Sequence, residues 1–73
     1  MAGVISILGA EKILKKAGAK RVSSRAAEEF AGLLEHIALL LAREIVDASE
    51  HAGRLTVKEE DVKFVMKRKI KEV

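Results

Sequence analysis

The chain contains no cysteine, proline, tryptophan or tyrosine among its 73 residues, and no asparagine or glutamine. The absence of cysteine excludes disulfides and zinc–thiolate sites as sources of stability. A single hydrophobic core is barely sufficient at this length, so association with a second chain is the ordinary remaining route to a stable fold. Plentiful lysine, arginine and glutamate without asparagine or glutamine is typical of high-temperature proteins, although a short chain can show this pattern by chance.

Long hydrophobic runs are also missing from the chain. The longest uncharged run in its middle, residues 37–42, is far shorter than the roughly 20 residues of a membrane-spanning helix. The apolar start of the chain has no basic flank, which disfavours a secretory signal. We therefore expect a cytoplasmic protein.

The net charge of +3 is distributed in three blocks of alternating sign. Residues 1–25 hold six lysines and arginines against one glutamate, and residues 51–73 hold seven against four acids. Residues 26–50 hold one arginine against six acids. This pattern predicts that the two flanking segments contact a polyanion while the central segment does not.

The spacing of apolar residues predicts three helices and no extended sheet. The helices are expected at about residues 5–17, 24–52 and 57–70. Gly18 and Gly53 follow the first two helices, where a glycine favours a left-handed stop.

Capping residues support two of the expected helix starts. Ser23 is the expected N-cap of the long helix, with Ser24 as the alternative. Thr56, followed three residues later by Glu59, predicts a capping box for the third helix.

The length of the central helix points to a second chain. At 1.5 Å per residue a helix of roughly 29 residues is about 43 Å long, whereas a compact 73-residue monomer is about 30 Å across. An apolar stripe runs along this helix at three- and four-residue spacing, and its members are Phe30, Leu33, Leu34, Ile37, Leu41 and Ile45. Because closed twofold dimers are the commonest soluble assemblies, we predict an all-α homodimer with this stripe as its core.

The two loops carry a resemblance to a known family. Residues 17–23, AGAKRVS, are similar to the AGAxRVS segment of archaeal histones. Residues 51–57, HAGRLTV, together with Asp61, are similar to the HAGRxT…D segment of the same family. The similarity covers about residues 7–70 without a gap between the motifs. It implies the histone fold, a single short–long–short three-helix domain over residues 1–73 that forms an intertwined handshake homodimer. It also implies a nucleoid-associated architectural protein that compacts, wraps or bridges double-stranded DNA with little sequence specificity.

The resemblance assigns roles to residues in both loops. Crossed long helices would bring the first loop of one chain beside the second loop of the other, where helix N-termini and guanidinium groups suit phosphate oxygens. The family implies that Arg21 enters the minor groove, held by the hydroxyl of the partner's Thr56. It also implies that Asp61 fixes Arg54, and we favour this structural role of Arg54 over direct DNA contact. The other expected DNA contacts are Lys12, Lys15, Lys16, Lys20 and Lys58, although a solvated surface is the alternative for some of these lysines.

Two features of the sequence bear on assembly beyond the dimer. The resemblance implies that dimers stack end to end through His51, which pairs with Asp61 of the neighbouring dimer beside a large apolar side chain. In this sequence the position of that large apolar side chain is occupied by Ala48, whose small side chain would weaken the end-to-end contact. Leu39 and Leu40 make the middle of the helix apolar on every side, as expected of a helix that is buried on every side. Dimers that pack face to face through this segment are one explanation, and an ordinary dimer with a more apolar surface is the other.

Catalysis is not expected from this sequence. His36 and His51 lie fifteen residues apart and have no carboxylate or thiol companions at ligand spacing, so no metal site is predicted. The chain also lacks a glycine-rich phosphate-binding loop, and no cofactor is predicted.

The competing function is a histone-fold protein-interaction module with weak or no DNA binding. Glu50, Leu55 and the acidic long helix favour this alternative. Arg21, Thr56 and the basic first helix favour DNA binding.

Overall fold

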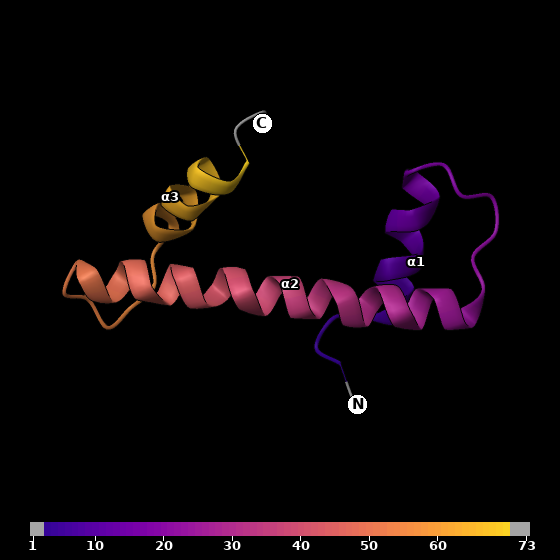
Figure 1. Ribbon diagram of the computed structural model, residues 1–73, viewed down its shortest axis with the longest axis horizontal. Helices are drawn as coiled ribbons and strands as arrows, with labels where there is room; N and C mark the ends of the chain where they lie inside the picture. Colours follow the sequence, from indigo (N-terminus) through magenta and orange to yellow (C-terminus); the bar gives the residue numbers. More distant parts are fainter. Residues whose placement is uncertain (1–2, 71–73) are drawn as a thin grey trace. The chain divides into compact units, whose positions relative to one another are not determined.

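The computed structural model describes residues 3–70, which form three α-helices and, within that range, no strands. Helix α1 spans Ile7–Lys16, α2 spans Ser24–His51 and α3 spans Glu59–Lys69 (Figure 1). The predicted all-α arrangement of a short, a long and a short helix is confirmed. The first two and last three residues of the predicted domain lie outside the described part of the chain.

The chain divides into two compact units, Met1–Ala38 and Leu39–Val73. In the first unit α1 packs against the N-terminal half of α2, and in the second α3 packs against the C-terminal half (Figure 1). Each unit therefore consists of one short helix and the half of α2 to which a short loop connects it.

Helix α1 begins two residues later than predicted because Ser6 is its N-cap. Ser6 has an extended backbone, and its hydroxyl accepts a hydrogen bond of 2.9 Å from the amide of Gly9. At the other end, Gly18 has φ +120°, a conformation that other residues adopt only with strain. This glycine turns the chain into the loop that carries the first motif.

Helix α2 has the expected cap at its N-terminus. The amide of Ala26 donates a hydrogen bond of 3.1 Å to the hydroxyl of Ser23, which confirms Ser23 rather than Ser24 as the N-cap. Gly53, with φ +74°, follows the helix and reverses the chain toward α3.

The predicted capping box of α3 is wrong. The helix begins at Glu59 with Lys58 as N-cap, so Thr56 lies too early to cap it. The carboxylate of Asp61 instead accepts a hydrogen bond of 2.8 Å from the amide of Lys58. The carbonyl of Thr56 is engaged by other side chains, which keeps residues before Lys58 out of the helix.

The apolar core of one chain is small. Within the described residues, the buried apolar side chains are Ala10, Ala27, Ala31 and Val65. Burying a valine-sized or larger side chain contributes roughly 1.5–3 kcal/mol, whereas ordering one residue's backbone costs about 1–2 kcal/mol. Yet on the predicted dimer stripe Leu33 remains 52% exposed and Ile37 45% exposed. The chain therefore leaves its larger apolar side chains for another surface to cover.

The two mid-helix leucines lie on different sides of α2. At about 100° per residue, Leu40 is about 60° from Ile37 and shares the side of the apolar stripe. Leu39 is about 160° from Ile37 and lies on the opposite side, where it is 50% exposed. Among the helices of the described region, none combines the length and apolarity that crossing a membrane requires.

Substitution of Ile37 by lysine tests the covering of the stripe. A charge placed in an apolar interface loses its hydration without gaining a partner, so Ile37→Lys is expected to abolish both dimerisation and folding. Far-UV circular dichroism and analytical ultracentrifugation at micromolar concentration measure the two effects. The matched control is Leu39→Lys, which places the same charge on the opposite side of α2 and should remain a folded dimer. A folded, monomeric Ile37→Lys protein would contradict the assignment of the stripe to the dimer core.

Candidate nucleic-acid interface

The first unit presents a cluster of exposed cations at the C-terminal end of α1 and in the following loop. All five basic residues predicted there are exposed, namely Lys12, Lys15, Lys16, Lys20 and Arg21. Lys15 pairs with Glu11 one helical turn earlier, at 3.1 Å between Nζ and Oε2. An exposed pair of this kind contributes little, so Lys15 is able to exchange Glu11 for another anion. We call these five residues the basic cluster.

The first loop is short and hydrogen-bonded. The amide of Ala19 donates to the carbonyl of Leu14, and the amide of Gly18 donates to that of Lys15, both at 3.0 Å. These bonds close α1 and direct the chain toward Arg21, two residues before the N-cap of α2. An exposed guanidinium beside the unpaired amides of a helix N-terminus is suited to phosphate oxygens.

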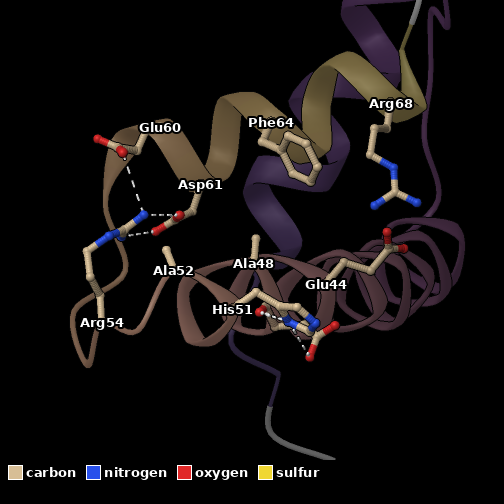
Figure 2. Close-up of a pocket in the computed structure, with 10 residues that line it drawn as sticks. Glu44, Ala48, His51, Ala52, Arg54, Glu60, Asp61, Phe64 and Arg68 are labelled. Carbon is tan, nitrogen blue, oxygen red and sulfur yellow. Dashed lines mark hydrogen bonds and ion pairs between the residues drawn. The ribbon is translucent and has the colours of Figure 1, made fainter.

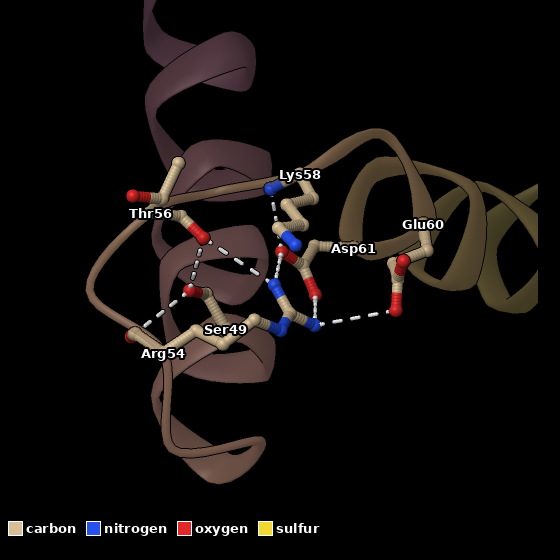
Figure 3. A network of polar contacts seen from close by, with 6 residues as sticks. All are labelled: Ser49, Arg54, Thr56, Lys58, Glu60 and Asp61. Carbon is tan, nitrogen blue, oxygen red and sulfur yellow. Dashed lines mark hydrogen bonds and ion pairs between the residues drawn. The ribbon is translucent and has the colours of Figure 1, made fainter.

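In the second unit Arg54 and Asp61 form a bidentate ion pair (Figure 3). Arg54 Nη1 donates to Asp61 Oδ2 at 2.7 Å, and Nη2 donates to Oδ1 at 2.8 Å. Asp61 is only 4% exposed, and its Oδ2 also accepts the amide hydrogen of Lys58. The loop between α2 and α3 is thereby tied to the first turn of α3.

A second set of bonds ties the same loop to α2. The hydroxyl of Ser49 lies 3.1 Å from the carbonyl oxygen of Thr56 and 3.3 Å from that of Arg54. Arg54 Nη1 also donates to the Thr56 carbonyl at 3.3 Å. Ser49 was not among the residues predicted from the sequence, because a serine that is buried in the fold cannot be told from an exposed one by its sequence position.

The ion pair shifts the protonation of both partners. The hydrogen bonds from the Arg54 guanidinium and from the Lys58 amide lower the pKa of Asp61 from 3.8 to about 2, although burial acts in the opposite direction. The hydrogen bond with Asp61 in turn raises the pKa of Arg54 above its ordinary value. Both side chains therefore remain charged at neutral pH.

The loop separates inward-facing from outward-facing groups. Arg54 is turned toward Asp61, with 23% of its side chain exposed. In Figure 3 the Thr56 carbonyl faces Ser49 and Arg54, whereas the Thr56 hydroxyl points away from them. Lys58 is exposed, and Leu55 is fully exposed at the loop. Of the predicted DNA-binding residues in this loop, Thr56 and Lys58 are thus accessible and Arg54 is engaged internally.

A groove of about 710 Å³ lies between the C-terminal half of α2 and α3 (Figure 2). Three residues predicted at the end-to-end contact, Ala48, His51 and Asp61, line it. His51 Nδ1 lies 3.0 Å from the backbone carbonyl of Asp47 on the same helix. Phe64, 53% exposed, supplies an apolar surface on the α3 side of the groove. Across residues 3–70 no three histidine or acidic side chains are placed to hold a metal ion.

The lowered pKa of Asp61 predicts how stability depends on pH. Because the folded-state pKa lies below the ordinary value, the ion pair stabilises the fold fully above about pH 5 and loses this effect as the pH falls toward 2. Thermal unfolding followed by circular dichroism between these pH values is expected to show a falling midpoint. Asp61→Asn should lower the midpoint by about 5 °C at pH 7 and flatten its pH dependence. Glu60→Gln is the control, since Glu60 is exposed and 3.6 Å from Arg54; an equal effect there would contradict the prediction.

Comparison with known proteins agrees with this geometry. Residues 7–66 match the family described as histone-like transcription factor (CBF/NF-Y) and archaeal histone. Probable archaeal histone 3 of Methanocaldococcus jannaschii is 57% identical over 56 residues, which cover 77% of this chain and 84% of the relative. A second relative, from the archaeal histone HAN1 of Thermococcus zilligii, is 42% identical over 57 residues, 78% of this chain and 85% of the relative. The chain therefore belongs to the histone-fold family of histone-like transcription factors and archaeal histones, which are structural DNA-binding proteins and not enzymes.

Proposed function

We propose that this protein is an architectural protein of the nucleoid that compacts double-stranded DNA as a handshake homodimer. The observation that carries the proposal is the basic cluster, five exposed cations around one end of α1, in a chain of the histone-fold family. Cations gathered on one surface attract the DNA backbone and release its counterions. The acidic composition of residues 26–50 leaves α2 unsuited to the same contact.

Arg21 and the second loop are proposed to act together across the dimer. Arg21 is exposed beside the N-terminus of α2, and the Thr56 hydroxyl points away from the bonds that hold its own carbonyl. These features support a contact in which the partner's Thr56 orients Arg21 toward the minor groove. Lys58 supplies a further cation on the same loop.

Recognition by this surface is expected to be nearly independent of sequence. The chain has two phenylalanines and no tyrosine or tryptophan, so it offers few side chains on which bases could stack. Lysines at the DNA backbone and an arginine in the minor groove would instead recognise the charge and the shape of the duplex. DNA affinity should therefore fall steeply with salt.

A protein-interaction module is the second candidate function. Leu55 is fully exposed in the α2–α3 loop, where a lysine or arginine would favour DNA. A leucine at this position contributes apolar surface to a protein partner and nothing to phosphate binding. This candidate requires that the basic cluster binds DNA weakly or not at all.

Arg21→Ala tests the DNA-binding function. A dimer loses two cations, so the slope of log affinity against log salt should decrease in magnitude by up to about 1.8, with an affinity loss of roughly tenfold at low salt. Fluorescence anisotropy with a mixed-sequence duplex at several salt concentrations measures both quantities. Arg43→Ala, on the acidic part of α2, is the control and should bind as the wild type does. Absence of wild-type binding even at low salt would leave only the interaction module.

We propose further that dimers associate into tetramers or larger assemblies on DNA. Two surfaces are available for this contact. One is the groove lined by Ala48 and His51, and the other is the side of α2 that carries Leu39. The groove corresponds to end-to-end stacking, and the Leu39 side corresponds to face-to-face packing. By helical angle Leu40 and Ala48 both lie on the side of the dimer stripe, about 60° and about 20° from Ile37.

Single-cysteine variants distinguish the two surfaces, because the protein has no cysteine of its own. Oxidative crosslinking in the presence of DNA is expected to join dimers through Ala48→Cys if they stack end to end, and through Leu39→Cys if they pack face to face. His36→Cys, an exposed position on α2, serves as the control for random collision. Covalent bridging no greater than this control at both positions would contradict the association of dimers.

A further inference from the structure

Ser49 is a polar residue at the centre of the second unit. It lies in the last turns of α2 and is only 2% exposed, although serine has no apolar side chain to bury. Its hydroxyl is 3.1 Å from the Thr56 carbonyl oxygen and 3.3 Å from the Arg54 carbonyl oxygen (Figure 3). Its own carbonyl accepts a hydrogen bond of 3.1 Å from the Arg54 amide. One residue of α2 therefore holds both ends of the segment from Arg54 to Thr56.

The chemistry of the hydroxyl makes this attachment specific. A serine hydroxyl has one proton to donate, which the two loop carbonyls share, with the shorter distance to Thr56. A serine within a helix often bonds a carbonyl of the preceding turn, but here both acceptors lie after Ser49 in the chain, beyond the end of α2. If the loop moved away, the buried hydroxyl would lose its acceptors, and that loss opposes the movement.

The Thr56 carbonyl is the point at which both attachments of the loop meet. It accepts from Ser49 on α2 and from Arg54, whose guanidinium is held in turn by Asp61 on α3. The backbone of Thr56 is thus fixed from two helices while its hydroxyl remains free to point outward. Removing Ser49's hydroxyl would leave only the longer bond of 3.3 Å from Arg54 at this carbonyl.

We propose that Ser49 is a positioning residue for DNA binding. Its buried hydroxyl sets the backbone of residues 54–56 so that the Thr56 hydroxyl is already oriented toward the partner's Arg21 before DNA arrives. A group that is fixed in its bound orientation loses less conformational freedom on binding, so the affinity is higher. The inference rests on the proposed DNA-binding function and names a residue of its machinery that does not itself contact DNA.

The test compares the wild-type chain with Ser49→Ala. Amide hydrogen exchange is expected to speed up in residues 54–58 of the variant while α1 keeps its protection. The dissociation constant for a mixed-sequence duplex should rise about fivefold, the effect of one lost hydrogen bond. The salt dependence of binding should stay unchanged, because no cation is removed. This combination separates positioning from direct phosphate contact.

Two controls separate positioning from general stability. Ser6→Ala removes the N-cap bond of α1 in the other unit and lowers stability without touching the loop. Ser49→Thr and Ser49→Val have nearly the same shape and differ in the hydroxyl, so a difference in DNA affinity between them reports the hydrogen bond alone. Binding is measured at a temperature at which circular dichroism shows every variant to be folded.

The outcomes are distinct. Weaker binding by Ser49→Ala and Ser49→Val than by Ser49→Thr and Ser6→Ala supports the inference. Equal affinity of Ser49→Thr and Ser49→Val, or an equal loss in Ser6→Ala, overturns it. If the wild type itself binds no DNA, the proposed function fails, and hydrogen exchange still decides the structural part. In that case unchanged exchange of residues 54–58 in Ser49→Ala overturns the assignment of Ser49 as the residue that orders the loop.

Discussion

The proposed burial of the apolar stripe of α2 against a second chain would supply the stabilisation that one chain lacks. Three alanines and one valine are the buried apolar side chains of residues 3–70, while Leu33 and Ile37 remain about half exposed. A chain with so little internal core is expected to fold only as it associates, because apolar burial is the main favourable contribution to folding. In the proposed dimer the folding unit is two chains, and a DNA surface that combines loops of both chains would exist only when the stripe is covered.

Polar bonds have a different task in this molecule, which is to hold the α2–α3 loop. Ser49, Arg54 and Asp61 connect the loop to both helices through hydrogen bonds that their side chains make. Such a network fixes the geometry of the loop more than it adds to the free energy of unfolding, because each of its hydrogen bonds replaces a hydrogen bond to water. In the proposed DNA-binding dimer, apolar packing would join the chains, and the hydrogen-bonded loop presents Thr56 and Lys58 at the surface.

Much of the fold and part of the site follow from the sequence. Apolar periodicity identifies the three helices, and Gly18 and Gly53 mark the ends of the first two because each has a positive φ. The start of α3 was not predictable from capping rules, since the hydrogen bonds at the Thr56 carbonyl come from Ser49 and Arg54 and depend on tertiary packing. Ser49 was missed for the same reason, because a buried serine and an exposed one look alike in sequence. The ion pair between Arg54 and Asp61 was implied by the family resemblance, but its burial required the structure.

The central claim is that a second copy of the chain covers α2, and the oligomeric state of the wild-type protein tests it most directly. Sedimentation equilibrium at micromolar concentration, without DNA and with folding verified by circular dichroism, measures the mass of the folded species. The account predicts twice the 8.0 kDa mass of one chain or a multiple of that dimer, with helical structure lost on dilution to the monomer. A stable, fully helical species of 8.0 kDa would contradict it.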